Sequence, residues 1–149
     1  MHVLIVDDEI PVATLLAEAV AGQGHEVTVA HGGAEALALW KQRRPDAVFL
    51  DLRMPRISGL DVLRAIRNAD ADLVVVVITG HASPEERETA HRLGVTDFVE
   101  KPFYLNRVSD ALAGLAHPRG GVAARPRRRA AERRLERSPM ARGRSSARV

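Results

Sequence analysis

Five short strand-like segments alternate with segments of helical periodicity over the first 117 residues of the chain. They cover residues 3–6, 26–30, 47–50, 73–78 and 97–100, and three of them, 3–6, 47–50 and 73–78, are continuous apolar runs. Continuous apolar runs of this length are typical of strands buried on both faces of a parallel sheet. Parallel neighbours need crossover connections, which the helical segments supply. The alternation therefore predicts an α/β fold with a five-stranded parallel sheet.

Helix signals stand between the predicted strands. Pro11 suits the first turn of a helix. Ser83, Pro84 and Glu86 have the spacing of an N-cap, a first helical residue and a capping-box acid. Gly94 is placed to end that helix. Five strand–helix units favour a doubly wound, flavodoxin-like sheet of order 2-1-3-4-5 with helices on both faces.

The net charge of +3 conceals two parts of opposite sign. Residues 118–149 contain 11 arginines and two glutamates, a net charge of +9, whereas the 11 basic and 17 acidic residues before them give −6. Residues 1–117 are therefore predicted to form one domain. Residues 118–149 are predicted to be a disordered, arginine-rich tail, with an arm for nucleic acid, an anionic membrane or an acidic protein as the alternative.

Composition excludes several classes of protein. Cysteine is absent, which removes disulfide frameworks and thiolate zinc sites and favours the cytoplasm. The longest apolar run, residues 73–78, is far shorter than the about 20 residues of a membrane span. The chain is therefore expected to be soluble and cytoplasmic, without a membrane span.

Polar residues follow the predicted strands, at the edge where ligands bind in such sheets. They are Asp7, Asp8, Asp51, Thr79 and Lys101. Three carboxylates at one edge repel each other unless a cation lies among them, and Mg²⁺ prefers such oxygen ligands. We expect the paired acids to hold the metal and Asp51 to act as a nucleophile toward phosphorus. Lys101 then contacts the phosphate, and Thr79 offers a hydroxyl.

Four segments, VLIVDDE, VFLDLRMPRISG, VVVVITGHA and DFVEKPF, resemble the receiver domain of bacterial two-component response regulators. They occur in the family's order within residues 1–117. The resemblance implies that Asp51 accepts a phosphoryl group from a sensor histidine kinase or a histidine phosphotransfer protein. It also implies that Asp7 and Asp8 bind Mg²⁺, that the backbone carbonyl of Arg53 completes the protein's ligands, and that Lys101 contacts the phosphate.

The same resemblance implies a two-state switch. Thr79 is the switch hydroxyl, and Phe98 occupies the position of the switch aromatic, without the hydroxyl of a tyrosine. Their movement remodels the surface around the fourth helix, fifth strand and fifth helix, where a downstream protein or a second copy of the chain would bind. The activity implied is limited to self-catalysed phosphoryl transfer and autodephosphorylation. Arg53 and His81 are hypothesised to tune the lifetime of the phosphorylated state.

Two other functions compete with a phosphoacceptor switch. One is a DNA-associated transcriptional regulator that uses the basic tail, although no helix-turn-helix or zinc pattern is present. The other is a metal-dependent phosphatase with an aspartyl intermediate. It is disfavoured because the first predicted strand ends in Asp-Asp-Glu rather than Asp-x-Asp. The sequence leaves the isomer of the Lys101–Pro102 bond open.

Overall fold

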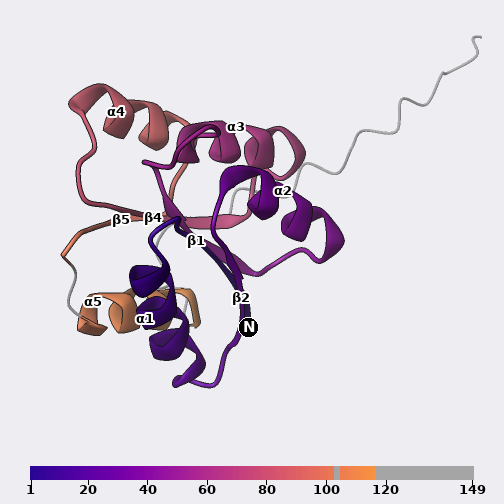
Figure 1. The fold of residues 1–149 in the computed structure, drawn as a ribbon, viewed down its shortest axis with the longest axis vertical. Coiled ribbons are helices and arrows are strands. Elements are labelled where there is room, and N and C mark those ends of the chain that lie inside the picture. Colours follow the sequence, from indigo (N-terminus) through magenta and orange to yellow (C-terminus); the bar gives the residue numbers. More distant parts are fainter. Residues whose placement is uncertain (103–104, 117–149) are drawn as a thin grey trace, which may run out of the picture. The chain divides into compact units, whose positions relative to one another are not determined.

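The computed structural model describes residues 1–102 and 105–116 (Figure 1). Strands and helices alternate along this part of the chain. Their bounds are β1 (His2–Val6), α1 (Ile10–Ala21), β2 (Glu26–Ala30), α2 (Gly33–Gln42), β3 (Ala47–Asp51), α3 (Gly59–Ala69), β4 (Val74–Thr79), α4 (Pro84–Arg92), β5 (Asp97–Glu100) and α5 (Leu105–Ala116). The predicted tail, residues 118–149, lies outside the described residues.

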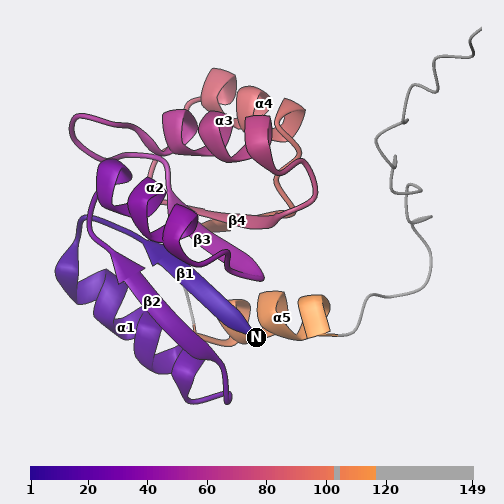
Figure 2. The ribbon, with the colours of Figure 1, turned by 90° about the vertical axis from the view of Figure 1, so that its right-hand side faces the viewer.

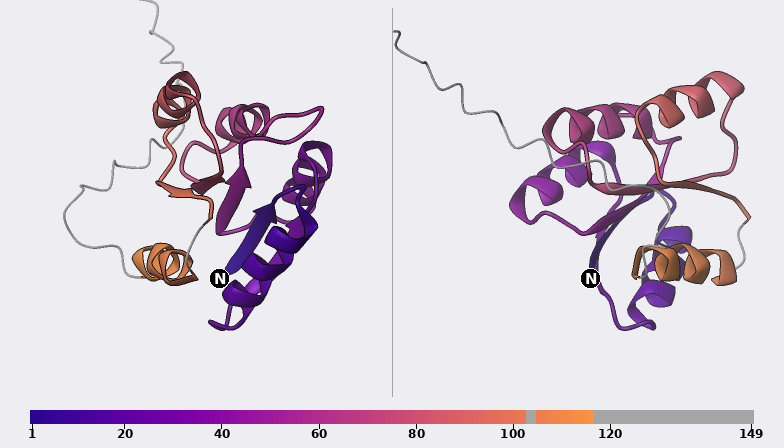
Figure 3. Two further views of the ribbon diagram at one scale, coloured as in Figure 1. Left: turned by 60° about the vertical axis from the view of Figure 1, so that its left-hand side comes forward. Right: turned by 180° about the vertical axis from the view of Figure 1, so that it is seen from behind.

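The strands form a parallel five-stranded sheet in the order β2-β1-β3-β4-β5. This order confirms the predicted doubly wound fold. Helices α1 and α5 cover one face of the sheet, and α2, α3 and α4 cover the other (Figures 2 and 3). Both the first and third strands lie inside the sheet, where β1 pairs with β2 and β3. The carboxyl ends of β1 and β3 are therefore adjacent.

Two apolar cores lie on the two faces of the sheet, because successive side chains of a strand point to opposite sides. Phe49 packs with Leu16 and Leu112 on the face covered by α1 and α5. Leu50 packs with Leu63 on the other face. Each fully buried side chain of this kind contributes about 1.5–3 kcal/mol through burial. The two cores fix the sheet, and with it the strand ends that carry the polar residues.

The observed elements differ from the predicted ones by a residue at some strand ends. β4 begins at Val74 and ends at Thr79, one residue later than predicted. The Leu73 N–H donates to Asp70 Oδ1 at 3.1 Å, so a turn takes the first amide of the apolar run. Thr79 pairs in register with Glu100 and so belongs to the strand.

Local signals set the start of two helices. The predicted capping box of α4 is present: the Glu86 N–H donates to Ser83 Oγ at 3.1 Å, and the Ser83 N–H donates to Glu86 Oε2 at 2.8 Å. At the start of α3, a Cβ on Gly59 would lie 2.1 Å from the backbone oxygen of Asp51. Only glycine allows α3 to approach the end of β3 so closely.

Among the described residues, no helix is both long and apolar enough to cross a membrane.

Candidate functional site

Three acidic side chains meet at the carboxyl edge of the sheet. Asp7 and Asp8 follow β1, and Asp51 is the last residue of the neighbouring β3. One carboxylate oxygen from each lies within 4.8 Å of the others. Asp7 is 1% exposed and Asp51 is 4% exposed, whereas Asp8 is half-buried. The structure therefore brings together the three acids that the sequence predicted, in an arrangement that could hold a metal ion.

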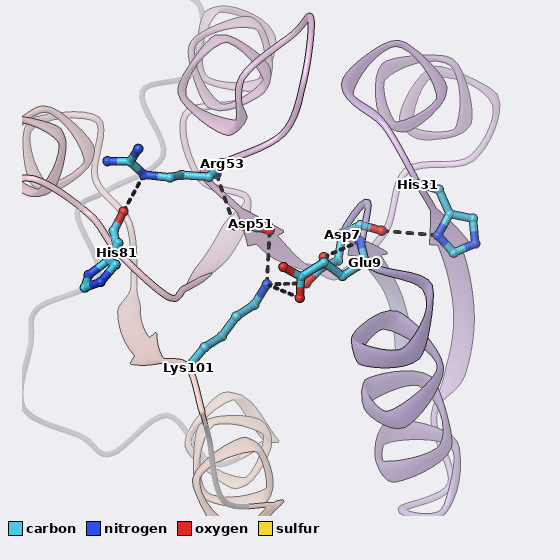
Figure 4. A network of polar contacts seen from close by, with 7 residues as sticks. All are labelled: Asp7, Glu9, His31, Asp51, Arg53, His81 and Lys101. Atoms are coloured by element: carbon cyan, nitrogen blue, oxygen red, sulfur yellow. Dashed lines mark hydrogen bonds and ion pairs between the residues drawn. The ribbon is translucent and has the colours of Figure 1, made fainter.

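Lys101 supplies a positive charge to the same cluster (Figure 4). Its Nζ lies 2.9 Å from Asp7 Oδ2 and 3.1 Å from Asp51 Oδ2. Its backbone N–H donates to the backbone oxygen of Thr79 at 2.9 Å, which joins Lys101 to β4. The Lys101–Pro102 bond is cis, which settles the isomer that the sequence left open. Four of the predicted strand-end residues thus face one another, and Thr79 adjoins them through its main chain.

The buried charges shift one another's protonation. Burial raises the pKa of Asp51, and nearby Asp7 raises it further. The Arg53 N–H and Lys101 act in the opposite direction without cancelling the rise. Burial alone would lower the pKa of Lys101, but its interactions with the carboxylates of Asp7 and Asp51 raise it above its usual value. Lys101 is therefore charged at neutral pH and partly offsets the two buried carboxylates.

The carboxylate oxygens of Asp7 and Asp51 differ in the hydrogen bonds that they accept. Asp7 Oδ1 accepts the Glu9 N–H at 2.9 Å, and Asp51 Oδ1 accepts the Arg53 N–H at 3.0 Å. Asp7 Oδ2 is buried and accepts no hydrogen bond from the described residues, although it is ion-paired with Lys101. A buried, anionic oxygen without a hydrogen bond is a suitable ligand for a hard cation. The donor set fits Mg²⁺.

The two predicted switch residues lie on neighbouring strands. Thr79 is 1% exposed, and its hydroxyl has no hydrogen-bond partner within the described part of the chain. Phe98 on β5 is half-buried against α4: its ring lies 4.8 Å from the His91 ring and 5.5 Å from the Arg87 guanidinium carbon. Arg87 is also ion-paired with Glu100. Phe98 thus lies half-buried between α4 and β5 and packs against the apolar core on that face of the sheet.

Arg53 extends from the site toward α4 (Figure 4). Its Nε donates to the backbone oxygen of His81 at 2.6 Å, and its guanidinium lies 3.4 Å from Glu86 Oε2. Arg53 and His81, which the sequence analysis linked to the lifetime of the phosphorylated state, are therefore in direct contact through the main chain of His81. The side chain of His81 is exposed.

Sequence reasoning missed one member of the cluster. Glu9 Oε2 lies 3.7 Å from Lys101 Nζ, although the Glu9 side chain is largely exposed. Glu9 is the third acid of the run that follows β1. That run was the available signal, but it does not show which of three consecutive acids turn toward the lysine.

The raised pKa of Asp51 predicts how the free energy of unfolding depends on pH. A carboxyl whose pKa is raised in the folded state stabilises the fold. This stabilisation is complete at pH values below the ordinary pKa of 3.8, and it is lost as the pH rises through the raised pKa. Asp51→Asn should therefore unfold at higher urea than the wild type at pH 7, with a gap that narrows toward about pH 4. Asp110→Asn, an exposed substitution on α5, is the control. Identical Asp51→Asn and wild-type curves at every pH would contradict the expectation.

Comparison with known proteins agrees with this geometry. Residues 3–113 match the family described as the response regulator receiver domain. Response regulator MprA of Mycobacterium avium is 39% identical over 108 residues, which cover 72% of this chain and 47% of MprA. The chain thus spans about half the length of the curated relatives it matches.

Solved structures show the same relationship. The chemotaxis protein CheY4 of Vibrio cholerae is 28% identical with a TM-score of 0.72, and the alignment covers 76% of this chain and 97% of CheY4. The receiver domain of NtrX from Brucella abortus is 36% identical with a TM-score of 0.71, covering 76% of this chain and 96% of that domain. The chain therefore belongs to the response regulator receiver family of two-component systems.

Proposed function

We propose that this chain is a phosphoacceptor switch of a two-component phosphorelay, phosphorylated on Asp51 in a Mg²⁺-dependent reaction. The phosphoryl group comes from a sensor histidine kinase or a histidine phosphotransfer protein. One observation carries the proposal: Asp51 is buried within 4.8 Å of two further acids and is ion-paired with Lys101. Membership of the receiver family supports the same reaction.

The site holds Asp51 ready for attack on phosphorus. The Arg53 N–H fixes Asp51 Oδ1, and the Lys101 ammonium lies beside Oδ2. A carboxylate oxygen of Asp51 bonds to the phosphorus of a phosphohistidine, the P–N bond breaks, and the electron pair leaves with the imidazole nitrogen. The flexible side chain of Lys101 can then reach a phosphoryl oxygen, and its compact ammonium charge stabilises the negative charge there. Hydrolysis of the acyl phosphate resets the switch.

The acids also provide a place for the metal. We assign Asp7, Asp8, Asp51 and the backbone carbonyl of Arg53 as the protein's ligands to Mg²⁺, because their oxygens suit a hard cation. When bound, Mg²⁺ neutralises charge on the incoming phosphoryl group.

Thr79 and Phe98 are proposed to convert phosphorylation into a change of surface. The Thr79 hydroxyl is buried without a partner among the described residues, so a phosphoryl oxygen near Asp51 offers it an acceptor. Movement of Thr79 would leave space that Phe98 can enter from its position between α4 and β5. The changed face, formed by α4, β5 and α5, is where a downstream protein or a second copy would bind.

The central test is phosphorylation by a small donor. We expect incubation with acetyl phosphate and Mg²⁺ to add one labile phosphoryl group, detected by intact-mass measurement. Asp51→Asn should show no adduct, because its amide is a poor nucleophile. Asp8→Asn should slow the reaction and weaken its dependence on Mg²⁺. The matched control is Asp110→Asn, which changes an exposed acid on α5. A stable adduct on Asp51→Asn would refute the assignment.

A second test concerns the lifetime of the adduct. Arg53→Ala removes the guanidinium that spans the gap to the β4–α4 connection, so water should reach the acyl phosphate more easily and hydrolyse it several-fold faster. His81→Ala keeps the main-chain acceptor of Arg53 and isolates the effect of the imidazole. Arg92→Ala, at an exposed position of α4, is the control. Unchanged dephosphorylation in both test variants would remove these residues from the proposal.

A DNA-associated regulator is the second candidate, and the +9 charge of residues 118–149 favours it. Neutralisation of phosphates by arginines makes DNA affinity fall steeply with salt. We expect the full chain to bind duplex DNA with such a dependence, and a chain truncated after His117 to lose the binding. Fluorescence anisotropy over a salt series measures both. Equal affinity of the two chains would assign the tail no part in DNA binding.

A further inference from the structure

Helix α4 has little apolar packing to hold it in place. It fully buries Ala90, whereas its other side chains are half-buried or exposed. By contrast, α3 buries Val62, Leu63 and Ile66. A helix with one buried side chain depends more heavily on polar contacts for its position. In α4 these contacts include the ion pair of its own Arg87 with Glu100 of β5 and the contacts of two arginines from outside the helix, one near each end.

The C-terminal end of α4 is closed by a turn. Gly94 adopts the left-handed conformation at φ +74°. Its N–H donates to the His91 oxygen at 2.9 Å, and the Val95 N–H donates to the Ala90 oxygen at 3.3 Å. These two bonds form a Schellman motif, which satisfies carbonyls inside the helix. The carbonyls of Leu93 and Gly94 lie beyond it and need other donors.

Arg67 supplies those donors from α3. Its Nε donates to the Leu93 oxygen at 2.6 Å, and Nη2 donates to the Gly94 oxygen at 3.0 Å. Its Nη1 donates to the oxygens of Asp70 at 3.2 Å and Leu73 at 2.7 Å. One half-buried guanidinium therefore joins the end of α4 to the end of α3 and the entry to β4. Lysine, with a single ammonium, cannot reproduce this planar set of donors.

The N-terminal end of α4 is held differently. There the exposed guanidinium of Arg53 contacts the His81 oxygen and Glu86, while the Arg53 N–H donates to Asp51 Oδ1. This end is thus connected to the phosphoacceptor by a single residue (Figure 4). The opposite end has no such link to Asp51 within the described residues, and Arg67 fastens it to α3.

We propose that Arg67 is a positioning residue that anchors the C-terminal end of α4, and that α4 pivots about this end when its N-terminal end responds to Asp51. The anchor is a property of the resting protein, whereas the pivot rests on the proposed phosphorylation. Changes of the backbone on phosphorylation should therefore be largest around residues 81–88 and smallest around residues 90–95, where movement of Phe98 alters only the side-chain contact of His91.

Hydrogen–deuterium exchange on the full, unphosphorylated chain tests the anchor. Arg67→Lys keeps the charge but loses most of the bonds, so amides of residues 93–96 should exchange about tenfold faster than in the wild type. Arg64→Ala is the matched control, because Arg64 lies one turn earlier on α3 and pairs only with exposed Asp61 among the described residues. Wild-type exchange in Arg67→Lys would overturn the anchor. Circular dichroism verifies that each variant is folded.

The same measurement after treatment with acetyl phosphate and Mg²⁺ tests the pivot. In the wild type, exchange should change in residues 81–88 and stay constant in residues 90–95. In Arg67→Lys, the intact mass should show normal phosphorylation while the change spreads into residues 90–95. Equal changes in both segments of the phosphorylated wild type would overturn the pivot. Absence of the adduct in the wild type would refute the proposed function instead, and leave the anchor to be judged by the resting protein.

Discussion

The ion pairs of Lys101 with Asp7 and Asp51 are the interaction on which the rest of the site depends. Two carboxylates that are 1% and 4% exposed repel each other, and only a nearby positive charge makes their joint burial tolerable. The lysine reaches them because its backbone N–H is bonded to Thr79 at the end of β4. The order of the strands therefore has an electrostatic consequence. Because β3, β4 and β5 are neighbours, the ammonium group of Lys101 lies beside the acids at the ends of β1 and β3.

Two buried oxygens at this edge lack hydrogen bonds from the described residues, and both suit the proposed ligands. They are Asp7 Oδ2 and Thr79 Oγ. A buried polar atom left unsatisfied costs about 1–3 kcal/mol. For Thr79 Oγ this cost would be recovered when a phosphoryl oxygen meets the hydroxyl, whereas Asp7 Oδ2 is already compensated by the Lys101 ammonium at 2.9 Å. The proposed phosphorylation would therefore satisfy a buried hydroxyl that the resting site leaves without a partner among the described residues.

The parts of this structure that follow from periodicity could be predicted from the sequence. Short strand-like segments, three of them continuous apolar runs, located the five strands to within about a residue. The rule that parallel strands present their carboxyl ends together predicted the meeting of Asp7, Asp8 and Asp51. The contacts of Glu9, Arg53 and Arg67 could not be predicted in this way. Long side chains with several rotatable bonds find partners through tertiary structure, and those partners are often main-chain oxygens that leave no trace in the sequence.

The energy needed to operate the proposed switch limits how firmly α4 can be held. Moving a two-state equilibrium from 1:99 to 99:1 takes about 5.5 kcal/mol of differential binding. Hydrogen bonds to charged groups contribute about 1.5–3 kcal/mol each, so two bonds at the upper end of that range, from groups such as Thr79 and Lys101 in the proposed phosphorylated state, would be sufficient. A helix packed through several large side chains would oppose them with a comparable energy. Because α4 fully buries only Ala90 and Arg67 secures one of its ends, a rearrangement at the other end has little apolar contact to break.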